Sequence, residues 1–308
     1  LKQYLDIKQK YSDYILFFRL GDFYEMFFED AENVSRELEL ALTSRAGSPM
    51  CGVPYHSCEI YLKKLIDKGY KVAICEQLTD PAASKGLVER DVIRLVTAGT
   101  VIESSMLNED SNNYIACICT DKAQGAAALV FADISTGEVH VFQKSGRQLE
   151  QDMISELSRF SPVEILIGQD FLDFKEVNGF VRDRLKRCLC EMLDDSSFDG
   201  SDMNIFTEQF ESGTELGISE MPLVKKALCA MFRYFGETQK ATVKRFVSLT
   251  VHADGEFMGL NLTTRRNLEL TETLRTKEKR GSLMWVLDKT VTAMGRRKLR
   301  SWIEQPLI

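Results

Sequence analysis

No stretch of the 308-residue sequence is long and apolar enough to cross a membrane. The longest apolar run covers residues 126–132, whereas a spanning helix needs about 20 apolar residues. The opening residues also lack the charged start and apolar centre of a secretory signal peptide. The sequence therefore predicts a soluble protein.

The sequence shows neither the cysteine spacing of a metal site nor a phosphate-binding motif. Eight cysteines in a chain of this length do not make a disulfide scaffold, and they favour a reducing cytoplasm. The pairs Cys117/Cys119 and Cys188/Cys190 lack the two- to four-residue spacing of structural zinc sites. The G-x-x-x-x-G-K spacing of a phosphate loop is absent. We expect no bound metal and no nucleotide site in these residues.

Positive charge is scarce in the middle of the chain. The net charge is -7, and residues 104–239 carry 12 basic and 23 acidic side chains, a net charge of -11. Residues 240–308 carry 14 basic and 7 acidic side chains, a net charge of +7. Because binding to DNA phosphates requires Lys and Arg, the middle segment is better suited to a protein partner.

The length and the 44% hydrophobic content predict two or three domains of an α/β multidomain protein. Residues 1–103 alternate short strands with helices, and 104–113 form a polar linker. Residues 114–239 repeat the α/β pattern, whereas 240–308 are dominated by helices.

Apolar spacing places the individual elements. It predicts helices at residues 1–14, 30–42, 57–68, 149–160, 222–235, 264–270, 282–288 and 292–302. It predicts strands at residues 71–75, 92–96, 114–119, 126–134, 139–142 and 164–167.

The most informative stretch is a predicted β-hairpin at residues 15–27, with Gly21-Asp22 as its turn. Side chains two residues apart in a strand point to the same side. Phe23 and Glu25 therefore share one face, and Tyr24 and Met26 turn to the other as core contacts. One interpretation makes Phe23 a core residue and Glu25 a solvated charge; the other makes them a binding pair.

The surrounding sequence favours a binding pair. Residues 19–27 (RLGDFYEMF) closely resemble the mismatch-recognition signature of the MutS family of DNA mismatch-repair proteins, whose F-x-E pair contacts the faulty base pair. Three further motifs resemble the same family in the same order: residues 51–56 (CGVPYH), Cys75-Glu76-Gln77 with Asp80-Pro81, and residues 94–100 (RLVTAGT).

The resemblance implies a fold for each segment and a role for two residues. Residues 1–103 would form a mixed α/β mismatch-recognition domain, 114–239 a ribonuclease H-like α/β connector domain, and 240–308 the truncated start of an α-helical core or lever domain. Phe23 would enter the minor groove as a wedge and stack on the mispaired base, and Glu25 would hydrogen-bond that base.

The resemblance also implies partners. The full-length protein would be an ATP-dependent, Mg²⁺-using homodimer that binds mismatched double-stranded DNA and recruits a MutL-type protein through the acidic connector domain. This fragment would carry no cofactor and no catalytic residue, so it would not itself be an enzyme. Its expected location is the bacterial cytoplasm, at the nucleoid when acting.

A basic cluster near the end of the chain is a further candidate DNA contact. Arg296, Arg297, Lys298 and Arg300 lie on one predicted helix. They contact the DNA backbone in one interpretation and form a solvated helix face in the other.

Two other functions remain open. A metal-dependent nuclease would use carboxylates such as Asp121 and Asp133 to hold Mg²⁺, although their turn-flanking positions favour surface placement of both. A MutS paralogue acting as a scaffold without mispair selectivity is the second, and the F-x-E pair argues against it.

Overall fold

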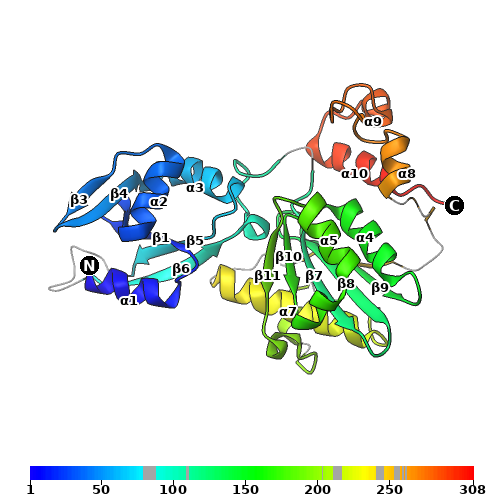
Figure 1. Ribbon diagram of the computed structural model, residues 1–308, viewed down its shortest axis with the longest axis horizontal. Coiled ribbons are helices and arrows are strands. Elements are labelled where there is room, and N and C mark those ends of the chain that lie inside the picture. Colours follow the sequence, from blue (N-terminus) through cyan, green and yellow to red (C-terminus); the bar gives the residue numbers. More distant parts are fainter. Residues whose placement is uncertain are drawn as a thin grey trace. The chain divides into compact units, whose positions relative to one another are not determined.

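The computed structural model describes residues 1–78, 88–108, 111–202, 204–210, 217–240, 246–252, 257–258, 260 and 262–308. The motif residues Asp80-Pro81 lie outside this part. The chain divides into two compact units, residues 1–107 with 233–244 and residues 108–232 with 245–308. Each unit contains a six-stranded mixed sheet (Figure 1), so the predicted α/β architecture is confirmed.

The sheet of the first unit has the strand order β3-β4-β2-β1-β5-β6. Strands β1 and β5 pair in parallel, and the other neighbours pair antiparallel. The strands are β1 (Ile15–Leu20), β2 (Phe23–Phe27), β3 (Thr43–Arg45), β4 (Ser48–Pro54), β5 (Val72–Gln77) and β6 (Arg90–Val96).

Helices cover both faces of this sheet. Helix α1 (Lys2–Lys10) packs Tyr4 and Ile7 on the face that carries Phe18 and Phe27. Helices α2 (Phe28–Leu38) and α3 (Cys58–Asp67) pack on the opposite face. The apolar clusters on the two faces of the sheet bury side chains from every strand except β3, which is exposed along its length.

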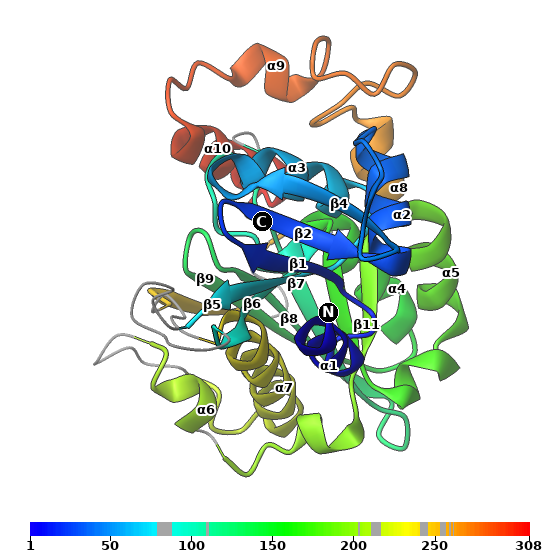
Figure 2. The same cartoon turned by 90° about the vertical axis from the view of Figure 1, so that its left-hand side faces the viewer.

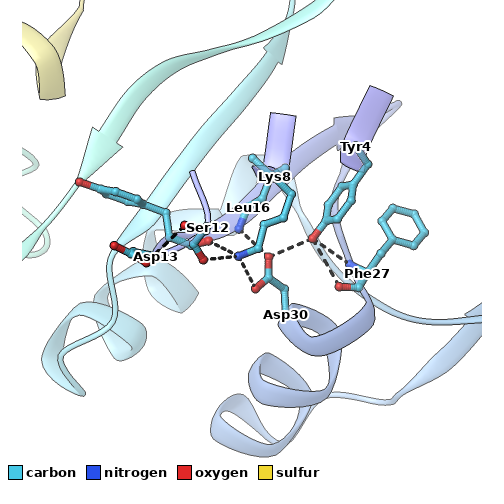
Figure 3. A network of polar contacts seen from close by, with 8 residues as sticks. Tyr4, Lys8, Ser12, Asp13, Leu16, Phe27 and Asp30 are labelled. Carbon is cyan, nitrogen blue, oxygen red and sulfur yellow. Dashed lines mark hydrogen bonds and ion pairs between the residues drawn. The ribbon is translucent and has the colours of Figure 1, made fainter. Parts of the chain in front are cut away.

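A buried carboxylate ties α1, β1 and α2 together (Figure 3). Asp30 accepts hydrogen bonds from the Tyr4 hydroxyl at 2.9 Å and the Leu16 amide at 3.0 Å, and it pairs with the Lys8 ammonium at 2.9 Å. Burial and the neighbouring Asp30 raise the pKa of Tyr4, so the phenol stays a neutral donor. The carboxylate therefore has a donor from each element that meets it.

Replacing Asp30 by alanine is expected to destabilise the first unit by about 3 kcal/mol, because the Lys8 charge and two further donors lose their acceptor. Glu29, the exposed acid one position earlier on α2, supplies the control. Hydrogen exchange of the β1 and β2 amides in Asp30→Ala and Glu29→Ala checks this. Equal protection in the two variants would contradict the assigned role.

The second sheet has the order β11-β10-β7-β8-β9-β12. Strands β7, β8 and β9 form an antiparallel meander, and the outer strands pair in parallel with their neighbours. The strands are β7 (Ile115–Asp121), β8 (Ala126–Asp133), β9 (Glu138–Ser145), β10 (Glu164–Ile167), β11 (Leu189–Met192) and β12 (Ser248–Val251).

Strand β8 is buried at every position because both faces of this sheet are covered. Helices α4 (Leu149–Phe160) and α5 (Lys175–Arg184) pack on one face around Phe131 and Phe142. The part of helix α7 (Pro222–Gln239) that belongs to this unit lies on the other side in Figures 1 and 2. Among the described residues, no helix has both the length and the apolar character that crossing a membrane requires.

Short helices complete the second unit. Helix α6 (Asn204–Thr207) precedes α7, and α8 (Leu262–Asn267), α9 (Leu283–Leu287) and α10 (Ala293–Glu304) follow β12. Helix α8 is anchored on α4, since the Arg265 guanidinium donates to the Ser155 carbonyl at 2.9 Å. The predicted helical character of the last segment is confirmed.

Several predicted boundaries were wrong. Helix α1 ends at Lys10 and not at residue 14, and α2 covers Phe28–Leu38 and not residues 30–42. Residues 43–54, for which no strand was predicted, form a β-hairpin of β3 and β4. Helix α5 and the strands β11 and β12 were not predicted.

Candidate nucleic-acid interface

The predicted hairpin is present, and its turn places Phe23 at the start of β2. Leu20 of β1 lies opposite Phe23, and Gly21 has a φ of +58°, a value that glycine adopts without steric cost. The Tyr55 amide donates to the Asp22 carbonyl at 3.0 Å, which fixes the turn from the β4 side. Strand β2 is held between β1 and β4, so Phe23 projects from a stiff three-stranded platform.

The two faces of β2 differ in exposure as predicted. Tyr24 and Met26 are buried, whereas Phe23 is 46% exposed. Phe27 shares the Phe23 face but is buried, because its ring packs at 5.1 Å from the ring of Tyr4 in α1. Helix α1 therefore covers one end of this face and leaves Phe23 accessible.

Gly52 of β4 lies opposite Glu25 and next to the Phe23–Glu25 pair. A Cβ at Gly52 would lie 3.6 Å from the Glu25 Cγ and 3.8 Å from the Phe23 Cδ1, which is ordinary van der Waals contact. The ring and the carboxylate thus lie side by side over a residue without a side chain.

Glu25 is held by a cation that the sequence did not reveal. The Arg45 Nη1 lies 2.7 Å from the Glu25 Oε2, and the Arg45 side chain is 54% exposed while that of Glu25 is only 15% exposed. Arg45 was missed because it belongs to the unpredicted strand β3, twenty positions along the chain. Its place just before the turn residues Ala46-Gly47 was the available signal.

The other family-like motifs support the hairpin from behind. The Tyr24 hydroxyl donates to the Glu76 carboxylate, and burial followed by this bond raises the pKa of Tyr24. The Arg19 guanidinium lies 3.4 Å from Glu76 and stacks at 3.6 Å over the ring of Tyr55. Residues from three sequence motifs therefore converge beneath Phe23.

The two candidate nuclease carboxylates do not converge. Asp121 ends β7 opposite Ala126, whereas Asp133 ends β8 one position beyond the pair Ile115–Ala132. At about 3.3 Å per residue, the two backbones are roughly 20 Å apart along the ladder. No group of three or more metal-ligating side chains occurs in the described ranges.

The predicted surface placement of Asp133 was wrong, because this residue is fully buried. Its carboxylate accepts from the Asn112 side chain at 3.0 Å, the Asn113 amide at 3.0 Å, the Ser135 amide at 2.9 Å and the Ser135 hydroxyl at 2.6 Å. These four donors occupy both oxygens, so Asp133 joins the linker to the β8–β9 turn.

Most of the basic cluster on α10 is engaged within the chain. Arg296 lies 3.4 Å from Asp288, Arg297 donates to the Asn108 carbonyl at 3.3 Å, and Arg300 lies 3.1 Å from Glu304. Lys298 is exposed. Contact between this cluster and DNA stays a prediction.

Sequence comparisons agree with this architecture. Models of three consecutive domains of one family match the chain: MutS domain I at residues 1–105, MutS domain II at residues 113–247 and MutS domain III at residues 263–308. The fold and the matched domains define the class, a multidomain α/β protein with MutS domain architecture. The chain belongs to the MutS family.

Individual relatives match along the whole chain. It is 44% identical over 314 residues to the DNA mismatch repair protein MutS of Ruminiclostridium cellulolyticum and 45% identical over 313 residues to that of Acetivibrio thermocellus. The MutS protein of Caldanaerobacter subterraneus is 43% identical over 315 residues. All of this chain is covered, and it spans 36% of the length of each of these relatives.

Proposed function

We propose that the first unit recognises mismatched base pairs in double-stranded DNA, with Phe23 as the inserted ring. The observation that supports this most directly is the 46% exposure of Phe23 on a rigid strand whose next residue, Tyr24, is buried. Recognition by an inserted ring does not depend on the base sequence around the mispair. Inserting a ring costs a few kcal/mol of unstacking at a paired step and less where the bases already fit badly.

Glu25 would hydrogen-bond the displaced base. An ionised carboxylate accepts from an imino N–H of thymine or guanine, and a protonated one donates to a purine ring nitrogen. Its position beside Phe23 over Gly52 supports this role, because both side chains would meet the same base step.

Replacing Glu25 by glutamine in a full-length protein that carries this chain tests the role. The amide keeps the shape, so affinity for matched duplex should change by no more than a few fold. The preference among G·T, unpaired T and matched duplexes should shift by about tenfold, equivalent to about 1.4 kcal/mol. Competition binding measures this shift, with Glu29→Gln as a control. An unchanged ranking of duplexes would refute it.

The longer protein would couple recognition to repair. The names of the relatives, DNA mismatch repair protein MutS, support a role in mismatch repair, and their greater length leaves room for further domains. By the family resemblance, such a longer protein would be an ATP- and Mg²⁺-dependent homodimeric mismatch sensor. The charge of -11 over residues 104–239 supports recruitment of a MutL-type protein through the middle segment. ATP chemistry would lie outside the three matched domains, and the residues of this chain would act as a recognition and connector module.

A further inference from the structure

Arg45 has a fixed backbone position and a solvent-exposed side chain. It is the last residue of β3, opposite Ser48, and the two turn residues Ala46 and Gly47 have φ values of +50° and +79°. Positive φ at both central residues is the geometry of a tight hairpin turn. Arg45 is therefore presented from a defined point on an edge strand.

The ion pair that Arg45 forms is asymmetric. The guanidinium faces solvent with 54% of its side chain exposed, while the Glu25 carboxylate is covered. Arg19, which lies on β1 of the hairpin that carries Phe23, is engaged with Glu76 and the Tyr55 ring. A pair with one partner this exposed is weak and is readily exchanged for another anion.

We propose that Arg45 is a positioning residue that holds Glu25 beside Phe23 in the free protein and transfers to a DNA phosphate when the site meets a duplex. This rests on the proposed function of the first unit. A guanidinium binds a phosphate through two parallel hydrogen bonds, which suits it for the exchange. The released carboxylate is then free to bond a base.

The salt dependence of binding tests the transfer. Each phosphate contact contributes about 0.9 to the slope of log K against log salt concentration. Arg45→Gln in a full-length protein should lower this slope by about 0.9 on both G·T and matched duplexes. Arg36→Gln removes the same charge from α2, on the opposite face of the sheet and 67% exposed, and should leave the slope nearly unchanged.

A double-mutant cycle tests the exchange itself. Glu25→Gln frees Arg45 beforehand, so affinity for matched duplex should rise, and adding Arg45→Gln should cancel that gain. Equal slopes for Arg45→Gln and Arg36→Gln, or a gain that survives the double substitution, would overturn the proposal. If the proposed function itself is wrong, the result is different. The wild-type protein then shows no preference for the G·T duplex, whatever the slope of its salt dependence.

Discussion

Replacing Phe23 by alanine in a full-length protein that carries this chain is expected to abolish most of its preference for a G·T mispair over matched DNA. Stacking of a base on an aromatic side chain contributes about 1–3 kcal/mol, so the preference should fall by roughly 5- to 150-fold. Affinity for matched duplex should change little, because backbone electrostatics supply it. Equilibrium binding to both duplexes at one salt concentration measures the ratio.

An exposed apolar residue elsewhere in the same unit provides the control. Ile60 lies on α3, on the sheet face opposite Phe23, and is 62% exposed. Neither Ile60→Ala nor Phe23→Ala should change stability by more than about 0.5 kcal/mol, since both side chains are at the surface. A Phe23→Ala protein that still prefers the G·T duplex as strongly as wild type would refute the wedge.

Replacing Asp133 by alanine is expected to destabilise the second unit by about 4 kcal/mol. The substitution removes a fully buried carboxylate that accepts from Asn112, Asn113 and Ser135, and each hydrogen bond lost to a buried group costs about 1–3 kcal/mol. For a unit of this size the melting temperature should fall by about 10 °C. Differential scanning calorimetry checks the fall.

Asp121 is the matched control, because it is the other carboxylate that a nuclease would need. It accepts only from the Gln124 amide, at 3.0 Å in an exposed turn, among the contacts of the described residues. Asp121→Ala should therefore cost less than about 1 kcal/mol. If both variants kept the wild-type melting temperature but lost an Mg²⁺-dependent nicking activity, the carboxylates would be catalytic and the structural assignment would fail.

The elements that the sequence predicted well are those whose signal is local. Strands of the meander and helices α4 and α7 carry long apolar patterns, so their existence followed from residue spacing. Strand β3 has three exposed residues, and β4 contains Pro49 and Gly52. The exposed residues of β3 and the Pro and Gly of β4 hid both strands in the sequence, and pairing of β4 with β2 and β3 defines them in the structure.

The candidate site shows the same division. Alternation along β2 determined by itself that Phe23 and Glu25 share a face and that Tyr24 and Met26 oppose it, because the strand period is two.

Only the tertiary structure decided that α1 covers Phe27 and leaves Phe23 exposed, that Arg45 pairs with Glu25, and that Asp133 is buried. These outcomes depend on segments that are distant in sequence and meet only after folding. Neighbouring residues set the direction of a side chain, whereas its exposure and its partners are set by whatever packs against it.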